Sequence, residues 1–134
     1  MQVLRHETLQ VRSQHDIVTV RQQTRAWAVA QGLSLVDQTK IVTAASELAR
    51  NTLEYGGGGT ATLEALQEGH RKGLRLCFED RGPGIADIGL ALTDGFTSGG
   101  GMGLGLSGSK RLVNEFDIWS KPGEGTRVTV TRWK

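Results

Sequence analysis

The spacing of apolar residues changes along this chain, and the order of those changes limits the folds that it can adopt. Residues 3–11 alternate as in a strand, whereas residues 13–31 and 34–53 place apolar side chains at helical intervals. Further strands are predicted where alternation returns, at 60–67, 74–79, 116–120 and 126–133. A strand, two helices and then two pairs of strands therefore form the framework of the expected fold.

Both long helices begin at a capping signal. Ser13 is followed three residues later by Asp16, and Ser34 is followed by Asp37, which is a capping-box pattern. Gly32 can end the first helix in a left-handed conformation. The boundaries of the helical half of the chain are therefore marked by local chemistry as well as by apolar spacing.

Two shorter helices are expected between the strand pairs, one within 85–95 and one over 106–115. The complete order of elements predicts an α+β protein: a two-layer sandwich with helices on one face of a mostly antiparallel sheet. A chain of 134 residues suits one hydrophobic core. We therefore expect a single domain over residues 1–134.

Composition excludes several classes of protein. Hydrophobic residues make up 37% and charged residues 22%, which is typical of a soluble globular protein. No apolar run approaches the roughly 20 residues that a bilayer requires, and the N-terminus has no signal-peptide pattern, so we expect a cytoplasmic protein without a membrane partner. A net charge of +2 is too balanced to predict nucleic-acid binding. Cys77, the one cysteine, lies in an alternating segment and is interpreted as a sheet residue.

A glycine-rich stretch at 96–110, "FTSGGGMGLGLSGSK", raises the question of phosphate binding. Ser109 and Lys110 stand in the reverse of the order that a P-loop requires. Residues 103–108 satisfy G-x-G-x-x-G, but no strand leads into them as a dinucleotide site demands. Glycine still lets backbone N–H groups approach an anion closely. A plain linker is the alternative, although leucines within the stretch can anchor it to a core.

The second helix carries a polar stripe in which Glu47 and Asn51 lie one turn apart. A solvated helix face explains such a stripe equally well. However, an amide oxygen is a hard ligand for Mg²⁺, and a neighbouring carboxylate can accept a proton from an attacking hydroxyl. The pair therefore has the composition that metal-assisted phosphoryl transfer requires.

A third polar set, "EDRGPG", follows the strand at 74–79. Its residues are common in turns, so a plain turn is one interpretation. The other is a carboxylate, Asp80, held at a strand end beside glycines that leave room for a flat ring. Such a carboxylate can accept a hydrogen bond from the exocyclic amine of adenine, which guanine replaces with a carbonyl.

Taken in order, "ELARN", "DRGPG" and "GGGMGLGL" resemble the N, G1 and G2 boxes of the GHKL superfamily of ATPases and kinases, which has the Bergerat fold. "GEGTRV" resembles its last motif. The short lid and minimal length are similar to the anti-sigma-factor type of serine/threonine kinase, and within it to the switch kinases of the stressosome. The resemblance implies ATP and Mg²⁺ as cofactors.

Residue roles follow from the resemblance. It implies that Glu47 is the general base and Asn51 the Mg²⁺ ligand, and that Asp80 binds the adenine amine with help from the Thr126 hydroxyl. It implies that glycines shape the adenine pocket at Gly82 and Gly84. It implies a lid and phosphate cradle at Gly101, Gly103, Leu104 and Gly105.

Two cations are left with open roles. Arg50 can contact the γ-phosphate or form a salt bridge with Glu47 or Glu54, and Lys110 can reach a phosphate or remain exposed.

The four glycines after Tyr55 depart from the family pattern and predict a mobile turn.

The resemblance implies an ATP-dependent kinase that phosphorylates STAS-domain stressosome proteins and is then released to activate a downstream regulatory protein. A second hypothesis is an anti-sigma-factor kinase that sequesters a sigma subunit and phosphorylates its STAS-domain antagonist. A third is a binding module in which nucleotide only controls association. Both kinase hypotheses predict ATP binding, so the partner distinguishes them.

Overall fold

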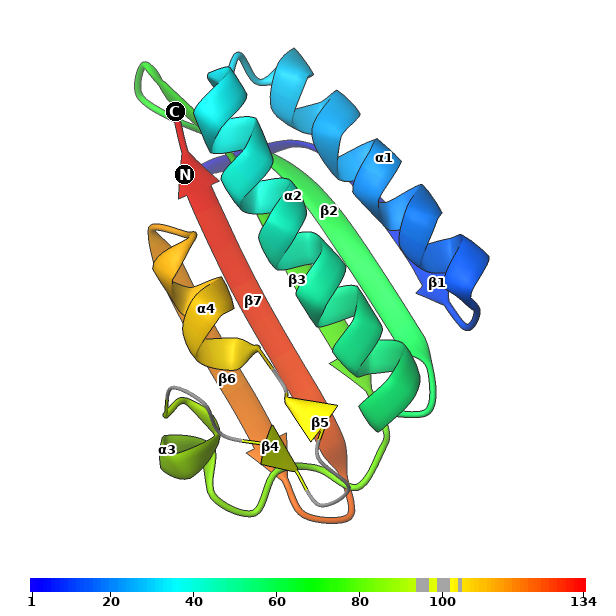
Figure 1. Cartoon of the computed structure of the whole chain (residues 1–134). Helices are drawn as coiled ribbons and strands as arrows, with labels where there is room; N and C mark the ends of the chain where they lie inside the picture. Colours follow the sequence, from blue (N-terminus) through cyan, green and yellow to red (C-terminus); the bar gives the residue numbers. More distant parts are fainter. Residues whose placement is uncertain (94–96, 99–101, 104) are drawn as a thin grey trace.

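A computed structural model describes residues 1–93, 97–98, 102–103 and 105–134. Five antiparallel strands form one sheet in the order β1-β2-β3-β7-β6. Their bounds are β1 Gln2–Val11, β2 Gly59–Glu68, β3 Arg71–Asp80, β6 Glu115–Lys121 and β7 Gly125–Trp133. The helices α1 (Gln14–Ala30), α2 (Leu35–Arg50) and α4 (Leu106–Arg111) lie on one face of this sheet (Figure 1). The predicted α+β sandwich is confirmed.

The remaining elements are short. A five-residue π-helix, η1 (Asn51–Tyr55), continues α2 without a break. The helix α3 covers Ile88–Ala91, and β4 (Thr97–Ser98) pairs with β5 (Met102–Gly103) in a separate two-stranded sheet. Residues 94 and 95, the end of the segment where a short helix was expected, lie outside the described residues.

Both predicted caps of the long helices are present. The Ser13 hydroxyl accepts a hydrogen bond from the backbone N–H of Asp16 at 3.2 Å, and the Ser34 hydroxyl accepts one from that of Asp37 at 3.1 Å. Gly32, which follows α1, has φ +78°, a value that favours glycine. Local sequence chemistry therefore determines where these two helices begin and where the first one ends.

The predicted helix over 106–115 is shorter in the structure and ends at Arg111. Asn114 is instead bonded to strand β7: its backbone N–H donates to the Thr131 carbonyl at 2.9 Å, and its side-chain oxygen accepts from the Trp133 N–H at 2.7 Å. Glu115 then begins β6. Pairing with a distant strand has replaced the last helical turn.

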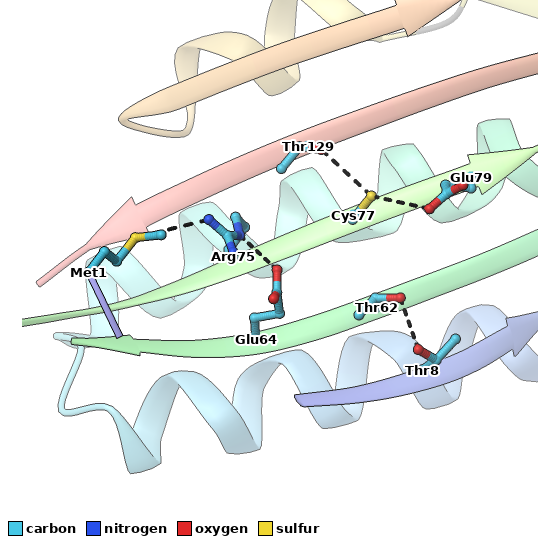
Figure 2. A network of polar contacts seen from close by, with 8 residues as sticks. All are labelled: Met1, Thr8, Thr62, Glu64, Arg75, Cys77, Glu79 and Thr129. Carbon is cyan, nitrogen blue, oxygen red and sulfur yellow. Dashed lines mark hydrogen bonds and ion pairs between the residues drawn. The ribbon is translucent and has the colours of Figure 1, made fainter. Parts of the chain in front are cut away.

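The hydrophobic core lies between the helices and one face of the sheet. Trp27 of α1 and Leu48 of α2 are buried with Leu76 of β3 and Val130 of β7 in one cluster. The other face of the sheet is polar, and Figure 2 shows its side chains pairing with one another. Thr8 and Thr62 share a hydrogen bond of 3.0 Å there. The folding energy from apolar burial is therefore concentrated on the helical side.

Cys77 lies within that polar face. Its sulfur accepts a hydrogen bond from the Thr129 hydroxyl at 3.6 Å and lies 3.8 Å from a Glu79 carboxylate oxygen (Figure 2). Burial raises the pKa of the Cys77 thiol above its ordinary value. The thiol therefore stays protonated near neutral pH, in agreement with its interpretation as a sheet residue.

Candidate active site

A cavity lies where the end of α2 meets the ends of β3 and β7. It contains about 350 Å³ of space, part of it open solvent. Its polar lining residues are Asn51, Thr52, Tyr55, Asp80 and Thr126, and its apolar ones are Leu48, Phe78, Ile85, Leu106 and Val128. The structure thus brings together Asn51, Asp80 and Thr126, three site residues that lie far apart in the sequence.

The π-helix η1 presents polar residues to this cavity. The backbone N–H of Gly56 donates to the Asn51 carbonyl at 2.9 Å, the five-residue spacing that defines a π-helix. The wider turn lets Asn51, Thr52 and Tyr55 all line the cavity. Glu54, which the sequence offered as a possible partner of Arg50, instead accepts a hydrogen bond of 3.5 Å from the Gln14 side-chain amide on α1. Apolar spacing gave no sign of this change in helical period.

Asp80 is the last residue of β3 and is half-buried. One of its carboxylate oxygens accepts a hydrogen bond from the Gly82 N–H at 2.9 Å. Burial raises the pKa of this carboxyl above its ordinary value, although hydrogen bonds from the backbone amides of Gly82 and Thr126 act in the opposite direction. The result is an acceptor group held in fixed orientation at the edge of an apolar cavity.

Glycines make room for the Asp80 side chain. A Cβ at Gly56 would lie 2.3 Å from the Asp80 carboxyl carbon, and one at Gly82 would lie 2.7 Å from the Gly56 Cα. The backbone N–H groups of Gly56 and Gly58 donate to carbonyls of η1 at 2.9 and 2.8 Å. The turn that the sequence predicted to be mobile is hydrogen-bonded here, and close approach accounts for glycine at position 56.

Glu47 and Arg50 form an ion pair on α2. Of the two roles considered for Arg50, a γ-phosphate contact and a salt bridge, this structure contains the salt bridge. A Cβ at Gly105 would lie only 2.6 Å from a Glu47 carboxylate oxygen. Gly105 has φ +64° and immediately precedes α4. The carboxylate of Glu47 therefore lies directly beside Gly105 of the glycine-rich stretch.

The other predicted site residues have varied positions. Gly84 is buried with φ +74°, and Gly103 belongs to β5. Lys110 is exposed on α4. Gly101 and Leu104 lie outside the described residues. Sequence reasoning missed the apolar lining and Tyr55, because their spacing differs in no way from that of ordinary core residues.

This arrangement defines a class of protein. Residues 36–134 match the family model described as histidine kinase-, DNA gyrase B-, and HSP90-like ATPase, and the chain belongs to this family. The family of ATP-binding domains agrees with a cavity that has a fixed carboxylate beside an apolar slot.

The relatives narrow the class to a kinase. The chain is 44% identical to the serine/threonine-protein kinase RsbT of Bacillus subtilis (strain 168) over 125 residues, which is 93% of this chain and 94% of that protein. A crystal structure of the RsbU and RsbW domains of a Mycobacterium tuberculosis protein has a TM-score of 0.64 and 28% identity, and covers 96% of this chain and 31% of that one.

A third comparison concerns the fold alone. The crystal structure of the SiaB–SiaC complex from Pseudomonas aeruginosa matches with a TM-score of 0.56 and 14% identity, covering 98% of this chain and 91% of that one. The nearly full-length similarity to RsbT and the match to the family model, by contrast, identify the chain as an ATP-dependent serine/threonine-protein kinase. Within the residues that the structure describes, no helix is long and apolar enough to span a membrane.

Proposed function

We propose that this kinase phosphorylates a STAS-domain protein of a stressosome-like complex and is then released to activate a downstream regulatory protein. The similarity to RsbT over nearly both chains supports this proposal. The observation that carries it is the meeting of Asn51, Asp80 and Thr126 on one cavity, with Glu47 on the same helical segment as Asn51. Such a site would hold ATP with its phosphates close to Glu47, the proposed general base.

The adenine end is assigned to β3 and β7. Asp80 accepts a hydrogen bond from the adenine amine, and the Thr126 hydroxyl assists it. The apolar cavity walls favour a flat ring, and Gly82 and Gly84 allow close backbone packing around the pocket, against Gly56 and Lys121 respectively. A half-buried carboxylate suits this role because a charge-assisted hydrogen bond is stronger away from bulk water.

The phosphate end is assigned to α2, η1 and the glycine-rich stretch. Glu47 acts as the general base that accepts the proton of the substrate hydroxyl. Arg50, in its ion pair with Glu47, orients that carboxylate and contacts the γ-phosphate. The remaining members of the proposed lid and phosphate cradle are Gly101, Gly103, Leu104 and Gly105.

Mg²⁺ fits the donor set at Asn51. An amide oxygen is a suitable hard ligand, and Mg²⁺ in kinase sites takes most of its other ligands from phosphates and water. Among the described residues no group of three His, Cys, Asp or Glu side chains could hold a metal alone, which is consistent with a site that nucleotide completes. When bound, the ion would neutralise charge on the phosphates.

The domain boundaries are also a proposal. We propose one domain over residues 1–134, because Val11 of β1 and Val130 of β7 are buried in the same core cluster as the helices.

A second candidate is an anti-sigma-factor kinase that sequesters a sigma subunit and phosphorylates its STAS-domain antagonist. The similarity to a structure containing an RsbW domain favours it as the alternative. Pulldown with the purified chain distinguishes the two: recovery of a stressosome scaffold supports the first proposal, and recovery of a sigma subunit supports the second.

The decisive experiment is a phosphoryl-transfer assay. The wild-type chain is incubated with Mg-ATP and a purified STAS-domain protein, and phosphate on the acceptor is followed by mass spectrometry. Transfer is expected with the wild type and not with Glu47→Ala. Binding of ATP without transfer to any STAS-domain partner would favour the third hypothesis, a module in which nucleotide only controls association.

A further inference from the structure

We propose that the hydroxyls of Tyr55 and Ser120 position the adenine pocket, and that Ser120 sets its selectivity for adenine over guanine by orienting the hydroxyl of Thr126. This inference rests on the proposed nucleotide site and adds two positioning residues to it. Neither hydroxyl belongs to the sequence motifs that pointed to the site. They come from different elements, η1 and β6.

Both hydroxyls hold the same peptide group, the one that joins Gly84 to Ile85. The Tyr55 hydroxyl donates to the Gly84 carbonyl at 2.8 Å, and the Ile85 N–H donates to the Ser120 hydroxyl oxygen at 2.7 Å. One side of the peptide is thus fixed by a donor and the other by an acceptor. Because both polar atoms of the group are bonded, the peptide plane cannot rotate without breaking a hydrogen bond.

The orientation of this peptide decides where a cavity wall lies. Ile85 is 8% exposed and lines the cavity beside Tyr55. Gly84 has φ +74°, and a Cβ there would lie 2.2 Å from the Lys121 carbonyl oxygen. The loop is therefore packed directly against the end of β6. Loss of either hydroxyl would release the wall that Ile85 forms.

The number of hydroxyl hydrogens gives Ser120 a second role, which is to orient the hydroxyl of Thr126. A serine hydroxyl has one hydrogen to donate, and that of Ser120 is directed to the Gly125 carbonyl at 3.0 Å. The Thr126 hydroxyl lies 2.8 Å from the Ser120 oxygen, so in this arrangement Thr126 is the donor of that pair. Thr126 has then used its only hydrogen, and its oxygen can act toward a ligand only as an acceptor.

The cavity consequently offers acceptors at both Asp80 and Thr126. The amine of adenine is a donor and matches them, whereas guanine has a carbonyl at the same position of the ring and would place acceptor against acceptor. An unpaired or repelled polar group in a partly buried site is costly. Without Ser120 the Thr126 hydroxyl can rotate and donate, which relaxes the choice between the two purines.

The test measures ATP and GTP binding by calorimetry for Ser120→Ala, Ser120→Thr and Tyr55→Phe. We expect Ser120→Ala to weaken ATP binding about tenfold and GTP binding much less, and Ser120→Thr to retain the wild-type ratio. Tyr55→Phe is expected to weaken both nucleotides by a similar factor of about three to ten, since it loosens the wall only. KM for ATP should rise in each weakened variant while kcat changes little.

Thr8→Val is the matched control, because it removes a hydroxyl pair of similar length on the polar face of the sheet. It should leave both affinities unchanged. Ser120→Cys, which keeps the side chain's shape with a weaker donor and acceptor, serves if Ser120→Ala does not fold. We expect an intermediate ATP-to-GTP ratio for it.

An unchanged ratio of ATP to GTP affinity in folded Ser120→Ala or Ser120→Cys would overturn the role of Ser120 in selectivity. Unchanged nucleotide affinities in Tyr55→Phe would overturn the role of Tyr55 in holding the Gly84–Ile85 peptide. Absence of ATP binding by the wild type would instead overturn the proposed nucleotide site and this inference with it. Failure to phosphorylate a STAS-domain protein would count against the proposed function alone, because the purine test reads binding.

Discussion

The two ends of the candidate site are built in different ways. At the Asp80 end, hydrogen bonds join the Asp80 carboxylate of β3 and the hydroxyls of Ser120 on β6 and Thr126 on β7 to one another or to backbone amides of the loop after β3. At the Glu47 end, charged side chains project from one helix, and the ion pair of Glu47 with Arg50 has side chains that are 32% and 46% exposed. The first end suits recognition of a fixed shape. The second can rearrange its charges when a nucleotide and a substrate arrive.

Replacing Glu47 by Ala should have the largest effect on activity, since it removes the proposed general base from the Glu47 end of the site. We expect phosphoryl transfer to fall by about 10² to 10⁴, with ATP affinity nearly retained. Single-turnover transfer and calorimetry measure the two quantities. Glu54→Ala, on the same helical segment but directed to Gln14, is the control and should keep activity. A fully active Glu47→Ala would refute the assignment.

Gly125→Ala tests the rigidity of the Asp80 end. Gly125 has φ +113°, and a Cβ there would lie 2.1 Å from the Asp80 carbonyl oxygen. We expect a loss of about 3 kcal/mol in the free energy of unfolding, measured with urea. Gly123→Ala also puts alanine at a positive φ, +78°, but one nearer the left-handed helical region, and the new Cβ meets open space, so it should lose only about 1 kcal/mol. Equal losses would show that packing around Asp80 is not tight.

Asp80→Asn tests recognition directly. The new amide either turns its NH₂ group toward the amine donor of adenine or loses its bond to Gly82, so ATP affinity should fall about 10- to 100-fold. Calorimetry with ATP measures it. Glu79→Gln, the neighbouring change on the polar face of the sheet, is the control. Wild-type ATP affinity in Asp80→Asn would remove Asp80 from the site.

The pH dependence of ATP binding is a second test of recognition at the Asp80 end of the site. Burial raises the pKa of Asp80 above 3.8, so the folded protein holds this proton more tightly than the unfolded chain does. The contribution of Asp80 to stability is therefore full below pH 3.8 and is lost as pH rises through the raised value. ATP binding has the opposite sign, because the ionised carboxylate is the acceptor.

We therefore expect ATP affinity to decline on acidification at a higher pH than an ordinary aspartate would cause, by about tenfold once Asp80 is protonated. Calorimetric titrations across mildly acidic pH measure the decline. Asp80→Asn should lack this part of the pH dependence. The same decline in that variant would assign it to another group.

Arg50→Gln should have the smallest effect on folding. Its ion pair with Glu47 is substantially exposed, and solvent screening limits such pairs. We expect the free energy of unfolding to change by less than about 0.5 kcal/mol in thermal or urea denaturation. A larger loss would mean that the Glu47 end is more rigidly built than the structure indicates.

Much of the site could be inferred from local patterns. Asp80 follows a recognisable strand, Asn51 follows Glu47 at helical spacing, and glycines mark the turns near both. Other features have no local signal. Apolar spacing gave no indication of the π-helix at 51–55, and Ser120 gives no sequence indication that it contacts Ile85.

The sequence by itself determined the order of helices and strands, the caps at Ser13 and Ser34, and the polar residues that an ATP site requires. These depend on contacts between residues a few positions apart, which periodicity records. The tertiary structure alone decided that the last helix ends at Arg111, that Arg50 pairs with Glu47, and that two hydroxyls hold the Gly84–Ile85 peptide. The first and last of these depend on hydrogen bonds between residues far apart in the chain. The second depends on a choice between Glu47, three residues before Arg50, and Glu54, four residues after it, and Glu54 instead lies near Gln14 of α1. Spacing along the sequence does not encode any of the three.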